Sequence, residues 1–135
     1  MKNILILCTG NSCRSQIAEG YFSCLLKEKV GIYSAGIETH GLNSYAVETM
    51  SRDRVDISKN TSNNIKEYLN INFDFIITVC DHAKENCPFF PSKNAIEIHQ
   101  NFFDPSKITN SNNDDYDQCR DEIKKFTIDF CKKYF

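Results

Sequence analysis

The sequence predicts an α/β protein built on a parallel sheet, because short apolar runs alternate with helical patterns. Residues 4–7 (ILIL) form a continuous apolar run that is too short for a helix and is bounded by a glycine-containing loop. Such a run is typical of a strand buried on both faces. Strands that alternate with helices pair in parallel through right-handed crossovers, and ligands bind just beyond the carboxyl ends of these strands.

The first strand delivers Cys8 to its carboxyl end, and the loop at 9–14 leads into a helix for which Ser15 is a plausible cap. The expected core-facing residues of this helix are Ala18, Tyr21, Phe22 and Leu25. The next expected elements are a strand at 31–34, a helix at 44–51, a polar stretch at 56–64 leading into a helix, a strand at 73–79 and a strand at 95–98. Together these predict a four-stranded parallel sheet in three layers, with helices on both faces.

The end of the chain has a different pattern. Residues 106–115 are rich in Ser, Asn and Asp and predict a solvated loop. After it, apolar residues recur three or four apart and form one stripe on an expected terminal helix. The stripe consists of Tyr116, Cys119, Ile123, Phe126, Phe130 and Tyr134.

The length and net charge of the chain restrict the classes of function that it can have. The 135 residues, of which 41% are hydrophobic and 25% charged, indicate one globular domain spanning 1–135. The net charge of -2, with both signs scattered, provides no basic stripe for nucleic acid. The apolar start is too short for a signal peptide or membrane span, so we expect a cytoplasmic protein with no membrane partner. Its seven cysteines cannot all pair, and in a reducing compartment cysteines are more often catalytic, metal-binding or buried.

The loop CTGNSCRS at 8–15 places a cysteine, five residues, an arginine and a serine between a strand and a helix. Its backbone N–H groups can turn inward as an anion-binding nest, towards which the following helix points its positive end. Gly10 would ease the turn, Arg14 would grip an oxyanion through two parallel hydrogen bonds, and the same field would favour a Cys8 thiolate. The alternative is that Cys8 is a small buried hydrophobe. The expected oxyanion-binding residues are Thr9, Gly10, Asn11, Ser12, Cys13, Arg14 and Ser15.

A second pair of cysteines lies further along the chain. Cys80 ends an expected strand, and Cys87 precedes Pro88. One alternative is a zinc site with His82 or His99, although paired zinc ligands usually stand only two to four residues apart. The other alternative is that both cysteines are unused.

Several stretches together resemble one family. They are LCTGNSCRSQ at 7–16, AEG at 18–20, YSAGIE at 33–38, HGLN at 40–43, DIS at 56–58, TS at 61–62, the segment 80–88, DP at 104–105 and RDEI at 120–123. With these motifs the chain closely resembles thioredoxin-coupled arsenate reductases, which share the fold and anion loop of low-molecular-weight protein tyrosine phosphatases. The resemblance covers nearly the whole chain.

This resemblance implies a reaction that detoxifies arsenic. Arg14 and the loop amides would bind arsenate, with phosphate or sulfate as competitors, Cys8 would attack it, and Asp104 would protonate the departing oxygen. A Cys8–Cys80 disulfide would form as arsenite leaves, and a Cys80–Cys87 disulfide would follow, to be reduced by thioredoxin. The segment 81–86 should then be mobile and partly exposed. The family often carries an acidic residue before the general acid, where this chain has Phe103.

The resemblance also assigns supporting positions. Asn11 and Ser15 are expected to support the loop and Cys8 by hydrogen bonds, and Cys13 is not expected to be a nucleophile. Cys24, Cys119 and Cys131 are expected at core or unused surface positions. No tightly bound cofactor or metal is expected. A weakly held monovalent cation is possible, since the residues matching its site are Asn11, Glu19, Ser34 and Thr61, but Asn63 replaces an expected aspartate.

Two other functions remain open from the sequence. A phosphatase acting on tyrosine phosphate would need only Cys8, Arg14 and Asp104. Such phosphatases commonly carry an aromatic residue where this chain has Ser106, and they do not need the second cysteine pair. The third reading is a non-catalytic oxyanion-binding or redox-sensing protein that retains the loop and the thiols.

Overall fold

The computed structural model, which describes residues 1–87, 94–108 and 110–135, contains one parallel sheet. Its strands are β1 (Lys2–Cys8), β2 (Val30–Gly36), β3 (Phe75–Thr78) and β4 (Ile96–His99). Their order across the sheet is β2-β1-β3-β4, and all neighbouring pairs are parallel. The predicted α/β class with a four-stranded parallel sheet is confirmed, and each expected strand is found within two residues of its predicted ends.

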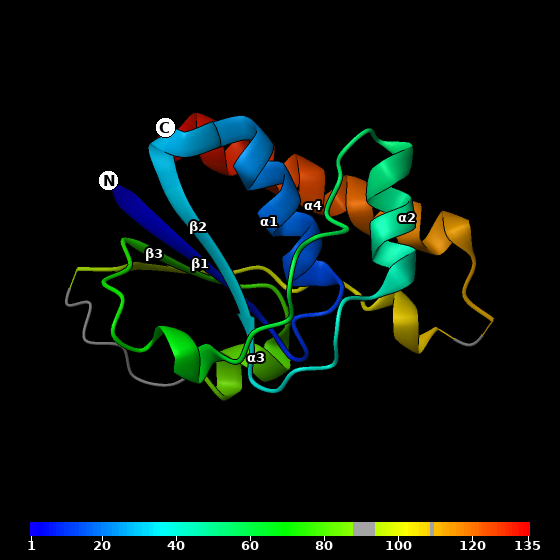
Figure 1. The fold of residues 1–135 in the computed structure, drawn as a ribbon, viewed down its shortest axis with the longest axis horizontal. Coiled ribbons are helices and arrows are strands. Elements are labelled where there is room, and N and C mark those ends of the chain that lie inside the picture. Colours follow the sequence, from blue (N-terminus) through cyan, green and yellow to red (C-terminus); the bar gives the residue numbers. More distant parts are fainter. Residues whose placement is uncertain (88–93, 109) are drawn as a thin grey trace.

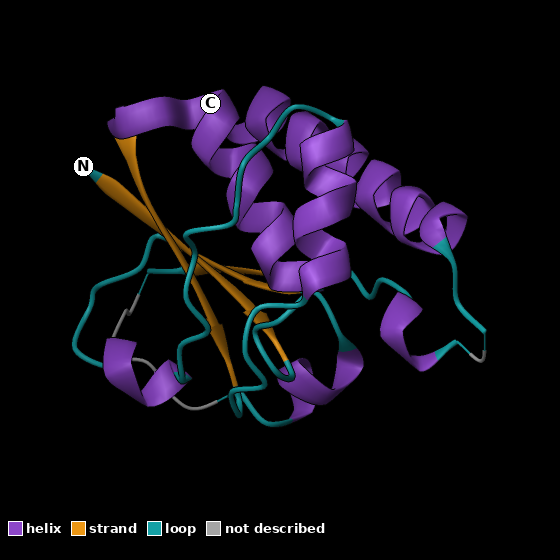
Figure 2. Cartoon of the chain, turned by 45° about the vertical axis from the view of Figure 1, so that its right-hand side comes forward, coloured by secondary structure: helices purple, strands orange, loops and turns teal. Residues whose placement is uncertain are grey.

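The helices lie on both sides of this sheet (Figures 1 and 2). They are α1 (Arg14–Leu26), α2 (Ser44–Arg52), α3 (Asp81–Glu85) and α4 (Asn113–Tyr134), with short 3-10 turns η1 (Lys27–Lys29), η2 (Ile65–Tyr68) and η3 (Pro105–Lys107). The long helices α1 and α4 pack together on one side, and α2 packs on α4. On the other side, the short helix α3 lies near the carboxyl ends of β1 and β3, towards which the strand arrows point (Figure 2).

The core lies between the sheet and the helix pair. The residues of β1 from Ile4 to Leu7 are completely buried, as expected for a strand covered on both faces. The Phe75 ring of β3 makes edge contacts with Phe130 and Tyr134 of α4, with centroids 5.1 and 5.0 Å apart. The predicted terminal stripe therefore faces the core: Tyr116, Cys119, Ile123 and Phe130 are buried, and Phe126 and Tyr134 are partly buried.

Two details of α1 correct the prediction. Helix α1 begins at Arg14 with Cys13 at its N-cap position, so Ser15 lies inside the first turn and does not cap it. Its hydroxyl contacts loop side chains, which competes with capping. The second correction is Leu25, which is 45% exposed, whereas Leu26 is buried.

Helix α4 starts earlier than its apolar stripe suggested, inside the predicted loop at 106–115. The Asn112 side chain accepts hydrogen bonds from Asp114 N and Asp115 N, and the Asp115 carboxylate accepts from Asn112 N. This capping box satisfies N–H groups that have no partner within the helix, so a polar stretch starts the helix. In the described part of the chain, no helix is long and apolar enough to cross a membrane.

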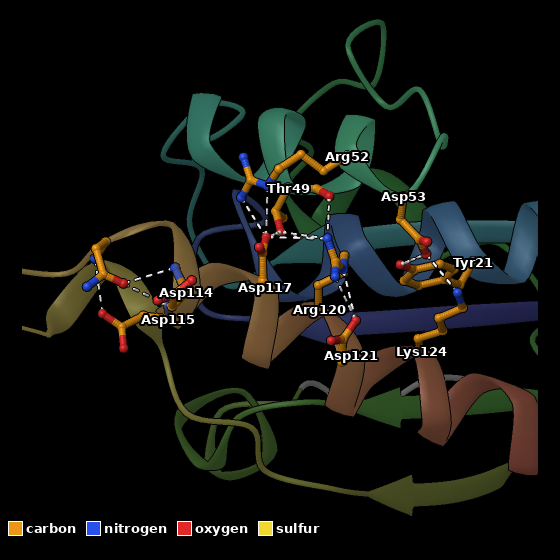
Figure 3. A network of polar contacts seen from close by, with 11 residues as sticks. Tyr21, Thr49, Arg52, Asp53, Asp114, Asp115, Asp117, Arg120, Asp121 and Lys124 are labelled. Atoms are coloured by element: carbon orange, nitrogen blue, oxygen red, sulfur yellow. Dashed lines mark hydrogen bonds and ion pairs between the residues drawn. The ribbon is translucent and has the colours of Figure 1, made fainter.

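A polar network joins α2 to α4 (Figure 3). The Asp117 carboxylate accepts hydrogen bonds from Thr49 Oγ1 and from Arg52 Nε, the latter at 3.0 Å, and Arg120 Nη1 lies 3.3 Å from the same oxygen. The hydrogen bond from Arg52 is the main cause that holds the pKa of Asp117 below its usual value.

We expect Asp117→Asn to lower the free energy of unfolding by about 1 kcal/mol at pH 7, because the acceptor loses its charge and the ion pairs with Arg52 and Arg120 are lost. The native state depresses this pKa, so the contribution is present above the unfolded carboxyl value of about 3.9 and is lost as the pH falls through the native value. Urea unfolding at pH 7 and pH 3 measures this dependence. Asp129→Asn, which breaks an exposed pair with Lys125, is the control. An equal loss for Asp117→Asn at both pH values would contradict the account.

Candidate active site

The loop between β1 and α1 is held from outside by the segment 37–43. Carbonyl oxygens of Cys8, Thr9, Gly10 and Ser12 accept backbone hydrogen bonds from Ile37, Glu38, His40 and Asn43, respectively. Asn11 adopts a left-handed conformation, with φ at 48°. Loop carbonyls engaged outward and a left-handed residue within the turn are the features of an anion-binding nest, whose N–H groups remain as donors.

Gly36, at the end of β2, allows this close approach. A Cβ atom there would lie 2.3 Å from Glu38 O and 2.8 Å from Asn11 N, both backbone atoms. We expect Gly36→Ala to destabilise the fold by about 1–3 kcal/mol and to weaken phosphate binding, because the loop backbone must shift. Chemical unfolding and titration calorimetry with phosphate measure the two effects. The comparison is Gly31→Ala near the start of β2, whose Cβ would lie 2.3 Å from Asn3 Oδ1 and away from the loop. It should cost stability alone, and equal phosphate affinity in the two variants would contradict the account.

The loop opens onto a small pocket of about 100 Å³. The lining residues are Cys8, Thr9, Gly10, Ser12, Cys13, Arg14, His40, Asp104, Ser106 and Lys107. The structure therefore brings the predicted nucleophile, arginine and general acid around one cavity, although Asp104 comes from far along the chain. Asn11 and Ser15, which were predicted to bind the oxyanion, do not line the pocket and lie fully buried behind it.

A chain of buried hydrogen bonds reaches Cys8 from behind. The Ser15 Oγ atom lies 2.9 Å from Cys8 Sγ, and Asn11 Nδ2 donates to Ser15 Oγ at 2.7 Å and to Ser34 Oγ at 3.0 Å. Because Ser15 Oγ accepts from Asn11, its own hydrogen is left to donate to the sulfur. This is the support that the sequence predicted for Asn11 and Ser15.

Arg14 is 8% exposed and lines the pocket. Its Nη1 donates to Phe102 O at 3.0 Å, and its Nη2 lies 3.5 Å from Asp104 Oδ2. The other oxygen of Asp104 accepts from Ser106 N at 3.0 Å and from Ser106 Oγ at 2.6 Å. The carboxyl group is therefore held beside the arginine and lines the same cavity as Cys8.

The other cysteines fit supporting or unused positions. Burial raises the pKa of Cys13 well above its ordinary value and that of Cys119 to about 12. These thiols stay protonated at neutral pH and are therefore poor nucleophiles. Cys119 Sγ donates to Phe103 O at 3.6 Å, Cys131 is partly buried and Cys24 is exposed.

Cys80 follows β3, and its sulfur forms the N-cap of α3 by accepting from Ala83 N at 3.4 Å. It is buried, and its Sγ atom lies 3.3 Å from the hydroxyl of Thr9, the residue after Cys8. Cys87 is partly buried just beyond α3, and its pKa is raised by burial and then by Glu97. Pro88, the last residue of the 80–88 match, lies outside the described residues.

The helix between these two cysteines is mostly exposed, with only Ala83 buried, as predicted for the segment 81–86. Its mobility stays a prediction. The two histidines of the zinc alternative have other neighbours: His82 Nδ1 lies 3.3 Å from Thr9 Oγ1, and His99 Nε2 lies 2.7 Å from Asp81 Oδ1. Over residues 1–87, 94–108 and 110–135, no group of three or more His, Cys, Asp or Glu residues is arranged to hold a metal.

The residues matching the monovalent cation site already contact protein groups. Glu19 accepts hydrogen bonds from Ser34 and from Asn60, and Asn11 Oδ1 accepts from Asn63 N at 2.8 Å. Burial raises the pKa of Glu19, although the hydrogen bonds from Ser34 and Asn60 act to lower it. The carboxylate of Glu19 and the Oδ1 atom of Asn11 thus already accept hydrogen bonds from protein groups. Binding of a monovalent cation stays a prediction.

Comparison with known proteins now assigns the family. Residues 3–134 match the family described as low molecular weight phosphotyrosine protein phosphatase. The chain belongs to this family. This resemblance was predicted from the loop and its flanking motifs and is confirmed.

Among its relatives, this member of the low-molecular-weight phosphatase family is similar to proteins named arsenate reductase. It is 45% identical over 123 residues to arsenate reductase 1 of Staphylococcus epidermidis, covering 91% of this chain and 90% of that protein. It is 43% identical over 127 residues to the arsenate reductase of Halalkalibacterium halodurans, covering 92% and 91%. A solved structure described as an arsenate reductase in the phosphate-binding state matches with a TM-score of 0.81 and 25% identity over the full length of both chains.

The structure adds pocket residues that the sequence reasoning did not assign to this family member's site. His40 lies in the HGLN match, and its ring covers Gly10, where a Cβ atom would lie 2.3 Å from Nδ1. Ser106 and Lys107 follow the Asp104–Pro105 pair and line the pocket with it. The HGLN match was the available signal for His40, whereas Lys107 carried none.

Proposed function

We propose that this chain reduces arsenate to arsenite, with Cys8 as nucleophile and with Cys80 and Cys87 as the relay. The observation that carries the proposal is the 45% identity, over 91% of the chain, to a protein named arsenate reductase 1. The small pocket that contains Cys8, Arg14 and Asp104 supports it, because a tetrahedral oxyanion needs hydrogen-bond donors, a nucleophile and an acid at one place.

The first step forms a covalent adduct. Arg14 and the loop N–H groups bind arsenate, and the Cys8 sulfur attacks arsenic while one As–O bond breaks. Asp104 supplies the proton with which that oxygen leaves as water. Because Asp104 Oδ1 is engaged by Ser106, the oxygen that lies towards Arg14 is the one available to carry the proton.

The second step transfers two electrons. The Cys80 sulfur attacks Cys8 Sγ, the S–As bond breaks with its electron pair on arsenic, and arsenite leaves as the Cys8–Cys80 disulfide forms. Cys87 then attacks Cys80, which releases Cys8 and leaves a Cys80–Cys87 disulfide. A thioredoxin dithiol would reduce this bond. The contact between Cys80 Sγ and Thr9 Oγ1 supports this order, because it places Cys80 beside the loop that contains Cys8.

The final disulfide requires α3 to unwind. Cys80 and Cys87 stand on either side of this five-residue helix, and the seven residue steps between them would span about 10 Å at the helical rise. Disulfide-linked residues have Cα atoms about 4.4–6.8 Å apart, so the two cysteines cannot pair across an intact helix. Such a rearrangement would also expose the oxidised pair to thioredoxin. We place this reaction in the cytoplasm, where thiols are kept reduced.

The test is arsenate-dependent NADPH oxidation with thioredoxin and thioredoxin reductase. We expect many turnovers with the natural chain, loss of steady turnover in Cys80→Ser and Cys87→Ser, and normal turnover in the control Cys24→Ser, which changes an exposed thiol. An inactive natural chain in the presence of active thioredoxin components would refute the proposal. Steady turnover would rule out a non-catalytic oxyanion-binding or redox-sensing protein.

A second candidate is hydrolysis of tyrosine phosphate, which the family description and the shared pocket favour. It would need Cys8, Arg14 and Asp104 but neither relay cysteine. Such phosphatases commonly carry an aromatic residue at the position of Ser106. Among the described lining residues, Ser106 and Lys107 follow Asp104–Pro105, and no aromatic ring other than that of His40 lines the pocket. Fast cleavage of a phosphotyrosine analogue by the natural chain and by both relay variants, without arsenate turnover, would favour the phosphatase.

A further inference from the structure

His99 connects the sheet to the short helix α3. It is the last residue of β4, and its Nδ1 atom lies 2.7 Å from Thr78 Oγ1 on the neighbouring strand β3. Its Nε2 atom lies 2.7 Å from Asp81 Oδ1, at the first residue of α3. The His99 side chain is 22% exposed and the Asp81 side chain 71%, so the contact with Thr78 is partly shielded from water and the contact with Asp81 lies at the surface. Both ring nitrogens are thereby engaged, which fixes the plane of the ring.

Asp81 is also held by Asn101, which lies two residues after His99. The Asn101 Oδ1 atom accepts a hydrogen bond from Asp81 N at 3.1 Å. The first turn of α3 is therefore attached to the carboxyl end of β4 through both the side chain and the backbone of Asp81. A helix of five residues gains little stability from its own hydrogen bonds, so such attachments decide where it lies.

The fixed turn begins at Cys80. The sulfur of Cys80 accepts from Ala83 N within the same turn and lies 3.3 Å from Thr9 Oγ1. Rotation of Asp81 away from His99 would turn the adjacent Cys80 and change the direction of its sulfur relative to the Cys8 loop. His99 also lines a hollow beside β3 and β4 together with Lys84, Cys87 and Glu97. It therefore contacts the first residue of α3 and lines the same hollow as Cys87, which follows that helix.

We propose that His99 is a positioning residue for the relay: by holding Asp81, it directs Cys80 towards Cys8. The proposal rests on the proposed function, since it assigns a role within the cysteine relay. It concerns the step in which the Cys80 sulfur attacks Cys8 and does not involve oxyanion binding. Loss of the His99 contacts should therefore lower the rate of disulfide formation and leave the pocket intact.

The experiment measures this attack without arsenate, using hydrogen peroxide. Peroxide oxidises the Cys8 thiolate to a sulfenic acid with release of hydroxide, and Cys80 then displaces a second hydroxide to form the disulfide. When Cys80 is slow, more peroxide converts the sulfenic acid to a sulfinic acid. Every sample carries Cys87→Ser, so that the Cys8–Cys80 disulfide is not exchanged onward. Peptide mass spectrometry of this reduced full-length chain gives the ratio of Cys8–Cys80 disulfide to Cys8 sulfinic acid over time.

We expect His99→Leu and Asp81→Ala to lower this ratio by about tenfold, because a small misplacement of a reacting group has a large effect on rate. Asp81→Asn should remain near the natural ratio, because an amide oxygen can still accept from His99 Nε2. Lys125→Gln, which breaks an exposed ion pair on α4, is the control for a general surface effect. Thermal unfolding identifies any variant that fails to fold, and Asp81→Ala tests the contact without changing the sheet.

Arsenate kinetics distinguish positioning from a structural defect. In the thioredoxin-coupled assay, both disruptive variants should lower kcat with an unchanged KM for arsenate and an unchanged inhibition constant for phosphate. An unchanged ratio of disulfide to sulfinic acid in His99→Leu and Asp81→Ala would overturn the proposal. If the natural chain forms the disulfide with peroxide but reduces no arsenate, then the proposed function fails while the role of His99 is still decided by the ratio.

Discussion

Replacing Arg14 with lysine is expected to lower kcat/KM for arsenate by about 100-fold or more. Lysine keeps the charge but cannot present two parallel donors to a tetrahedral oxyanion. The native guanidinium is also fixed by Phe102 O at 3.0 Å and by Asp104 at 3.5 Å, and a single ammonium group cannot keep both contacts and bind substrate. Removal of one preorganised donor from such a site typically costs about 100- to 1000-fold in rate.

The coupled assay measures this loss, and phosphate inhibition shows how much of it lies in oxyanion binding. The control is Arg52→Lys, which changes a partly exposed arginine in the α2–α4 network. It should affect stability by about 1 kcal/mol at most and leave arsenate kinetics unchanged. If Arg14→Lys retained most of the natural kcat/KM, the loop would not be the arsenate site.

Asp104→Asn is expected to lower kcat for arsenate reduction by about 100-fold, because an amide cannot supply the proton that the departing oxygen needs. The amide oxygen can still accept from Ser106 N and Oγ, so the turn that begins at Pro105 should persist. The change should therefore appear in kcat and leave phosphate affinity close to the natural value.

The measurement is the steady-state rate over a range of pH, with Ser106→Ala as the matched control. That variant removes the 2.6 Å hydroxyl contact to Asp104 Oδ1 but keeps the carboxyl group, so it should lose much less activity. Equal losses in the two variants would mean that Asp104 acts through the conformation of the turn and has no role as an acid.

The parts of the fold that the sequence predicted are those with strong local patterns. The apolar run at 4–7, the stripe on the terminal helix and the loop with Cys8 and Arg14 each carry their signal within a few residues. Ser15 was misassigned as a cap because its hydroxyl contacts Asn11 and Cys8, which are brought near it by the turn of the loop. Leu25 and Leu26 follow Phe22 by three and four residues, so both fit the apolar spacing and the pattern alone did not decide between them.

The residues that the sequence missed depend on contacts between distant segments. His40 reaches the pocket because the segment 37–43 runs beside the loop, and His99 meets Asp81 because β3 and β4 are neighbours in the sheet. Neither pairing follows from spacing along the chain. Cys80 was predicted as a relay residue from the family resemblance, while its contact with Thr9 came only from the fold.

The most direct measurement of the central claim uses Cys87→Ser in a single turnover without thioredoxin. The reduced variant is mixed with excess arsenate, and arsenite and disulfide-linked peptides are quantified. The relay predicts about one arsenite per chain together with a Cys8–Cys80 disulfide, because Cys80 can attack Cys8 but the next exchange is blocked. The account would be contradicted if the folded, reduced variant released no arsenite and formed no Cys8–Cys80 disulfide.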